Sequence, residues 1–174
     1  MDTLLLSPSD GHRAGIEAPV VIHDFVRVDL PFDAVVAAFA HSVGPDLLSA
    51  LVDRAWTEEV AEITRRDALR IEPLSHDHAI DAWIGPYRSR LDTVIVPISW
   101  RSSRDTWMPP LDADLEIVGF GTDRTHLHVL GRSSLPPCAV PFTERASLNH
   151  RLAVALVRHV LCDLATQLVT DAAG

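Results

Sequence analysis

Residues 111–132 read LDADLEIVGFGTDRTHLHVLGR, and this stretch decides the fold. Apolar and polar residues alternate over 112–118, which is the period-2 pattern of an antiparallel strand with one buried face. Residues 119–123 are typical of a turn, and the alternation resumes over 124–132. The stretch therefore predicts a β-hairpin.

A long amphipathic helix is predicted from residue 142 to about residue 170. Large apolar residues recur there at every fourth position, namely Leu148, Leu152, Leu156, Val160, Leu164 and Leu168. At 1.5 Å per residue, such a helix spans roughly 40 Å and can cross a whole sheet. Three polar residues, Asn149, Asp163 and Gln167, lie at helical angles close to the apolar stripe. These residues are the exceptions that need explaining.

The earlier part of the chain predicts more strands and two short helices. A first strand covers 20–29, with Asp24 on its apolar side, and helices follow over 34–40 and from Pro45 onward. Residues 79–87 and 91–101 form a second antiparallel pair, in which Pro97 implies a bulge or an edge position. The pattern over 57–70 suits a helix or a strand, and the choice stays open.

Composition limits the class of protein. The chain has 174 residues, 47% of them hydrophobic and 22% charged, and no apolar run long enough for a membrane span. We expect a loose arm over 1–18 followed by one domain over 19–174. No export signal is expected, and the two cysteines, Cys138 and Cys162, favour a reducing cytoplasm over a disulfide framework.

Charge and residue usage exclude several functions. The net charge is −9 and no basic stripe is visible, which disfavours nucleic acid as a partner. All basic residues are arginine, so Schiff-base chemistry and a Walker-type phosphate lysine are excluded. No Gly-x-Ser-x-Gly elbow is present, and neither cysteine lies in a catalytic motif.

Four segments carry a resemblance to a known family: VDLPFDAV at 28–35, VPISW at 96–100, LDADL at 111–115 and the stretch 131–137. With the order of elements, they make the chain resemble the START-like helix-grip superfamily, also called SRPBCC. The resemblance implies an α+β fold in which an antiparallel sheet wraps around a long C-terminal helix, with two short helices after the first strand. It also implies a cavity for an apolar ligand. Some members are cyclases, aromatases or oxygenase subunits, but no Cys/His iron–sulfur pattern stands here.

The function expected is binding of a small hydrophobic or amphipathic ligand between the sheet and the C-terminal helix, without a cofactor. The expected ligand-binding residues are Asp24, Trp83, Trp100, Asn149, Leu156, Asp163 and Gln167. One alternative is a cyclase or dehydratase that uses Asp24, His159 or Asp163 as an acid–base pair in the cavity. Another is an interaction module with a filled core. No catalytic residue is assigned, and a homodimer is left open.

The hairpin histidines have two interpretations. If Gly121 is the centre of the turn, Glu116 faces His126 and Asp114 faces His128. Such a set could bind a metal, but it lies opposite the apolar face, so we expect a solvent-facing charge ladder and no metal site.

Overall fold

The computed structural model describes residues 19–67, 79–104, 108–134 and 142–173. Its elements are β1 (Val20–Val28), α1 (Phe32–Ser42), α2 (Pro45–Asp67), β2 (Ile80–Ile84), β3 (Arg88–Arg90), β4 (Thr93–Ser102), β5 (Leu111–Gly119), β6 (Thr125–Ser133) and α3 (Phe142–Ala172). The expected N-terminal arm, residues 1–18, lies outside the described residues.

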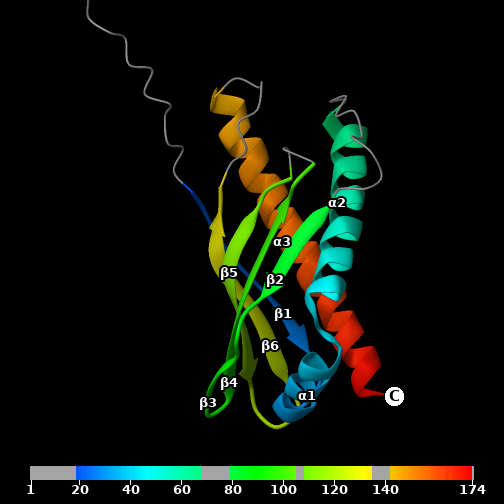
Figure 1. The fold of residues 1–174 in the computed structure, drawn as a ribbon, viewed down its shortest axis with the longest axis vertical. Helices are drawn as coiled ribbons and strands as arrows, with labels where there is room; N and C mark the ends of the chain where they lie inside the picture. Colours follow the sequence, from blue (N-terminus) through cyan, green and yellow to red (C-terminus); the bar gives the residue numbers. More distant parts are fainter. Residues whose placement is uncertain (1–18, 68–78, 105–107, 135–141, 174) are drawn as a thin grey trace, which may run out of the picture.

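The six strands form one antiparallel sheet in the order β1-β6-β5-β4-β2, and β3 pairs with β4. Helix α3 runs along one face of this sheet, with α2 beside it and α1 at one end (Figure 1). We call the face that the helices cover the inner face. The α+β helix-grip architecture expected from the sequence is confirmed.

Alternation along each strand separates the inner face from the outer face. Val96, Leu115 and Val129 are buried on the inner face, whereas their neighbours Glu116 and His128 are only half-buried on the outer face. This pattern follows from the pleat, because successive side chains of a strand point to opposite faces. The predicted strand pattern is therefore confirmed.

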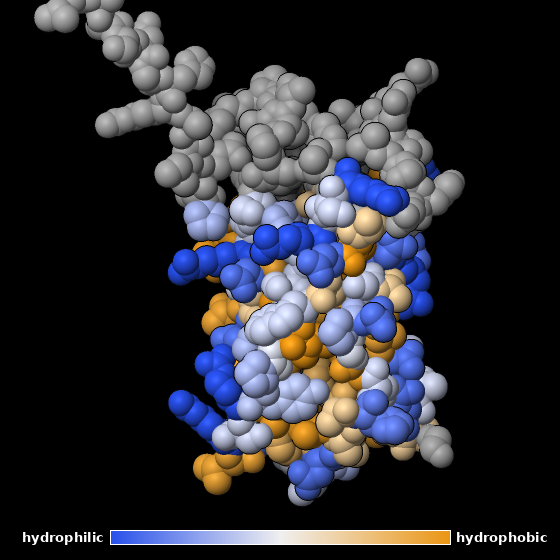
Figure 2. All heavy atoms as spheres, viewed as in Figure 1, coloured by the Kyte–Doolittle hydropathy of each residue, from blue (hydrophilic) through white to orange (hydrophobic). Residues whose placement is uncertain are grey.

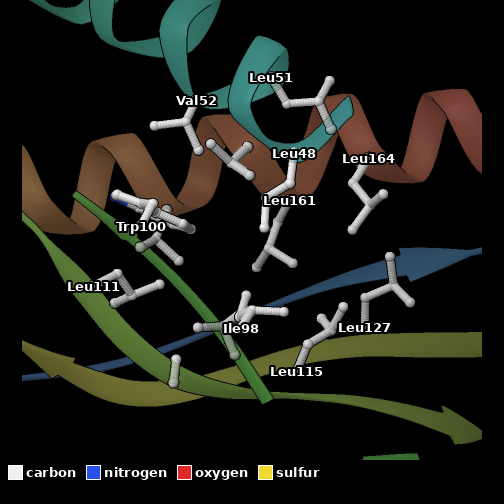
Figure 3. Close-up of a cluster of buried hydrophobic side chains, with 14 of the residues drawn as sticks. Leu48, Leu51, Val52, Ile98, Trp100, Leu111, Leu115, Leu127, Leu161 and Leu164 are labelled. Carbon is white, nitrogen blue, oxygen red and sulfur yellow. The ribbon is translucent and has the colours of Figure 1, made fainter. Parts of the chain in front are cut away.

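The apolar stripe of α3 packs onto the inner face as predicted. Its described members are all buried: Leu152, Leu156, Val160, Leu164 and Leu168. Figure 3 shows strand residues such as Ile98 and Leu115 pointing toward Leu161 of α3 and Leu48 of α2. The core therefore lies between the sheet and both long helices.

Both N-terminal helices are longer than expected. Helix α1 begins at Phe32, and the Pro31 carbonyl accepts hydrogen bonds from the backbone N–H groups of Ala34 and Val35. Helix α2 continues to Asp67 and so includes most of the stretch left open by the sequence. Its buried residues recur at helical spacing: Leu48, Leu51, Val52, Ala55 and Trp56. The local pattern over 57–70 suited a helix or a strand equally. Packing of the apolar face of α2 against the core favours the helix.

Pro97 does not lie on an edge strand, because β4 pairs with β5 on one side and with β2 and β3 on the other. Its carbonyl accepts the N–H of Gly85, which lies in the break between β2 and β3. The N and C=O of a residue in an antiparallel strand point to the same side. The backbone nitrogen of Pro97, which has no N–H, therefore faces the break between β2 and β3. The proline costs no strand-to-strand hydrogen bond there.

The register of the β5–β6 hairpin differs from the expected one. Glu116 pairs with His128 and His126 pairs with Val118, so the predicted pairs are shifted by two residues. The last pair is Gly119 with Thr125, and the loop closes through a hydrogen bond from the Phe120 N–H to the Arg124 carbonyl. The turn is thus longer than the one assumed, and its centre lies one residue further along the chain.

One helical segment of the described chain, His150–Ala172, is long and apolar enough to cross a membrane by composition alone. Half of its apolar window is buried inside the protein, as is usual for the core helix of a folded domain. Helices α1 and α2 pass the same test only if they are combined across a bend of 96°.

Candidate functional site

A small cavity lies between the sheet and the three helices. Its volume is about 10 Å³, close to the roughly 10–15 Å³ that one water molecule requires. Every described side chain that lines it is apolar: Phe39, Val43, Leu48, Ile84, Ile98, Trp100, Leu115, Val129, Val157, Val160, Leu161 and Leu164. A water molecule there would lack side-chain hydrogen-bond partners, so the cavity favours an apolar occupant.

Trp100 forms one wall of this cavity, and it lies there because β4 alternates. Its side chain is buried on the inner face, and its indole N–H donates to the carbonyl of Pro109 at 3.2 Å. The only polar group of the indole is therefore satisfied within the protein, and the ring is free to present its apolar surface.

Helix α3 provides the opposite wall through four residues on one side: Val157, Val160, Leu161 and Leu164. Leu156, an expected ligand-binding residue, is buried in the core but does not line the cavity. Asn149 belongs to α3, but its side chain lies outside the described part of the structure.

Two of the expected polar residues, Asp24 and Asp163, lie outside the described cavity lining. The Asp24 carboxylate is buried and accepts from Arg158 Nε of α3 at 2.6 Å, and its other oxygen accepts the N–H of Phe25 at 2.8 Å. Asp163 pairs with Arg54 of α2 at 2.8 Å, which ties the two helices together near the surface. Each carboxylate is thus placed against an arginine from a distant part of the chain.

Two further expected residues lie apart from the cavity. Gln167 donates to Asp171 at 2.9 Å, one helical turn along α3. Trp83 lies on the outer face, with 51% of its surface exposed, and its ring covers Gly85. Of the six expected ligand-binding residues whose side chains the structure describes, only Trp100 lies in the cavity wall.

No acid–base pair lines the cavity in the described residues. His159, the third candidate of the enzyme hypothesis, lies between two carboxylates of α2, with 3.3 Å to Glu58 and 3.4 Å to Glu59. Asp24, His159 and Asp163 therefore each have a separate partner and do not converge on one point. General acid–base chemistry needs titratable groups within hydrogen-bond reach of a bound substrate, and this arrangement does not provide them.

The outer face carries a second feature, which the sequence did not reveal as a unit. His23 and Phe25 of β1 meet His126 and His128 of β6, and Phe120 of the turn adds a further ring. Ring centroids are 5.5 Å apart for Phe25 and His128 and 5.1 Å apart for Phe120 and His126. We call these five residues the aromatic–histidine patch.

The patch lowers the pKa of His128 below its ordinary value of 6.5. Partial burial is the main cause, followed by the nearby His126, and His23 adds to the effect, whereas the carboxylate of Glu116 acts in the opposite direction. Within the described chain, no group of three or more His, Cys, Asp or Glu side chains is arranged to hold a metal ion.

No protein-family model and no curated protein matches the sequence. Among solved structures, the chain is similar to the Zhui aromatase/cyclase from Streptomyces sp. R1128, with a TM-score of 0.38 and 13% identity over 84% of this chain and 94% of that chain. It is also similar to a START superfamily protein from Mycobacterium smegmatis, with a TM-score of 0.37 and 13% identity over 84% and 97% of the two chains. A hypothetical protein from Helicobacter pylori gives a TM-score of 0.38 and 11% identity over 93% and 98%. The helix-grip assignment rests on the strand order and helix placement of the chain itself.

Proposed function

We propose that this protein binds a small apolar molecule in the cavity between α3 and the inner face of the sheet. The observation that carries the proposal is the chemistry of the cavity, whose twelve described lining side chains are all apolar. An apolar void leaves its lining without contacts on one side, so an apolar guest gains dispersion contacts there and displaces no well-bound water.

A guest larger than one or two atoms requires the cavity to widen. Pockets for small molecules usually measure roughly 300 Å³ or more, far above the present 10 Å³. The strands are held by continuous ladders, whereas α2 and α3 are joined by apolar side-chain packing and, at their margin, by the partly exposed Arg54–Asp163 pair and by His159. Side chains can repack without breaking a backbone ladder, and ion pairs of this kind typically contribute about 0.2–1 kcal/mol, so separation of the helices is the easier movement.

The surface view is compatible with access from the side of β2 and α2. Figure 2 shows hydrophobic atoms in the middle of the face on which β2 and α2 lie side by side, between more hydrophilic margins. Ile84 of β2 and Leu48 of α2 both reach the cavity from this side. We therefore include widening between β2, α2 and α3 in the proposal.

The test is a fluorescence titration with anilinonaphthalene sulfonate and a neutral polyaromatic probe. Val160→Phe fills the cavity, whereas Val169→Phe adds the same ring at a position of α3 that is 43% exposed. We expect Val160→Phe to weaken probe binding by ~tenfold or more and Val169→Phe to leave it unchanged. Val160→Ile provides a smaller filling change if the Phe variant does not fold. The absence of binding by the wild-type chain, or equal effects of the matched variants, would contradict the proposal.

A second candidate function is an interaction module whose core is filled by its own side chains. The small volume of the cavity favours it directly, because the helices and sheet already close on one another. Native mass spectrometry of freshly purified protein separates the two functions, since a retained small molecule is expected only for the ligand-binding protein. We place either function in the cytoplasm, supported by the exposed free thiol of Cys162.

A further inference from the structure

The cavity wall is closest to solvent at the end of β2. Of the twelve described lining residues, eleven are buried, and Ile84, the last residue of β2, is the half-buried exception. The most exposed of the other eleven is Val43, at 8%, which directly follows α1. The wall is therefore least shielded from water at a point where one strand and one helix both end.

The connections on either side of this point can move without loss of strand pairing or helix. Residues 85–87 lie between β2 and β3 and belong to neither strand. Gly85 keeps one backbone hydrogen bond, to the Pro97 carbonyl at 2.7 Å, so the two residues after it form the freer part of this connection. Residues 43–44 join α1 to α2 across a bend of 96°. A Cβ at Gly44 would meet nothing within 4 Å, so there is space around this junction.

Tyr87 covers the cavity wall from outside. Its ring meets the ring of Phe39 edge-on, with the ring centroids 5.8 Å apart and the ring planes at 63°. Phe39 lines the cavity and is only 1% exposed, whereas Tyr87 is 42% exposed. Tyr87 is thus the outer member of an aromatic pair whose inner member belongs to the wall. A single edge contact between two rings is weak enough to break and form again while the protein stays folded.

We propose that the apolar ligand enters and leaves the cavity past Ile84, between the end of β2 and the α1–α2 junction, and that Tyr87 is the gate of this entrance. The inference rests on the proposed function, because it assigns a route to the same cavity. Movement of residues 86–87 carries the Tyr87 ring away from Phe39 and opens a path lined by Phe39, Val43 and Ile84. Return of the ring closes the path and excludes water from the cavity, as mobile loops do in many binding sites.

The other borders of the cavity are less suited to the passage of an apolar molecule. Strands β4, β5 and β6 are joined by continuous ladders, which close the sheet side. The seam between α2 and α3 carries charged side chains at its margin, in the Arg54–Asp163 and His159–Glu58 pairs. A ligand that crossed this seam would desolvate charged groups, which is costly. Separation of α2 and α3 makes room for a ligand already inside, so widening and entry are different movements.

The test is stopped-flow fluorescence of the full chain with the neutral probe N-phenyl-1-naphthylamine. Tyr87→Ala removes the gate ring, so we expect the association and dissociation rate constants both to rise by the same factor, ~threefold or more. The dissociation constant should change by less than ~twofold, because the ring contact is present in both the free and the bound protein.

Two variants serve as controls. Tyr87→Phe keeps the ring and should keep the wild-type rate constants. Phe25→Ala removes a ring of similar exposure, which contacts His128 at 5.5 Å on the opposite edge strand of the sheet, and should also leave both rate constants unchanged.

The outcomes separate this inference from the function on which it rests. Probe binding that is weakened by Val160→Phe, with rate constants unaffected by Tyr87→Ala, would overturn the gate and leave the proposed function standing. Faster exchange in Arg54→Ala but not in Tyr87→Ala would place the entrance at the α2–α3 seam and would equally overturn the gate. A rise in the dissociation rate constant alone would make Tyr87 a ligand contact and not a gate. No probe binding by the wild-type chain would contradict both the function and the gate.

Discussion

The two faces of the sheet are built by the same strands and differ in almost every physical respect. The inner face is covered by three helices, is apolar throughout the cavity lining and leaves a void of only about 10 Å³. The outer face leaves Phe25, Phe120 and His23 exposed and His126 and His128 half-buried. Because successive side chains of a strand point to opposite faces, neighbouring residues have different structural roles. Leu115 and Val129 stabilise the core, whereas Glu116 and His128 shape the surface.

The largest difference between the faces is expected in stability. Leu156→Ala removes a fully buried side chain of the α3 stripe and should lower the free energy of unfolding by ~2–5 kcal/mol. Val169→Ala, on the exposed side of the same helix, should change it by less than ~0.5 kcal/mol. Denaturant titration measures both. Similar losses for the two variants would mean that α3 does not pack as described.

A smaller loss is expected where the inner face has no room for a side chain. A Cβ at Gly131 would lie 2.3 Å from Ala113 Cβ and 2.5 Å from the Asp112 carbonyl oxygen, so the backbone has to shift. Gly131→Ala should therefore cost ~1–3 kcal/mol. Gly44→Ala is the matched control, because a Cβ there meets nothing within 4 Å. An unchanged melting temperature for Gly131→Ala would refute the close approach of β5 and β6.

The smallest effect concerns protonation on the outer face. Because the folded-state pKa of His128 lies below its ordinary value of 6.5, the unfolded chain binds the proton more readily. The contribution of neutral His128 to the free energy of unfolding is therefore fully present above about pH 6.5. It is lost as the pH falls through the folded-state pKa. An NMR titration should give His128 a pKa below 6.5, and Glu116→Gln should lower that pKa further by removing the attraction. A pKa at or above 6.5 would mean that His128 is not partly buried beside His126 as described.

Local periodicity was sufficient to predict the inner face. The four-residue repeat of α3 and the alternation over 111–132 depend on neighbours in the chain, and both describe the structure correctly. Strand alternation also distinguishes Trp83 from Trp100. In β2, Ile80, Ala82 and Ile84 point to the inner face, so Trp83 points to the outer face. Trp100 belongs to the buried phase of β4.

Contacts between distant segments could not be predicted in this way. The sequence placed Asp24 on the apolar side of its strand, but its partner Arg158 is 134 residues away. The aromatic–histidine patch forms because β1 pairs with β6, a neighbour relation that no local pattern encodes. The hairpin register depended on the length of one turn, and an error of one residue at its centre moved each pair by two. The volume of the cavity is the small difference between the space enclosed by the sheet and helices and the volume of the side chains that fill it. Composition does not determine this difference.

Methyl and aromatic NMR spectra of the full chain, recorded during titration with a neutral polyaromatic probe, test the difference between the two faces most directly. The account predicts saturable shifts at Val157, Val160 and Leu164, with Val21 and Leu130 unchanged. Shifts confined to Val21, Leu130 and the aromatic–histidine patch, with the cavity residues unmoved, would contradict an apolar ligand site on the inner face.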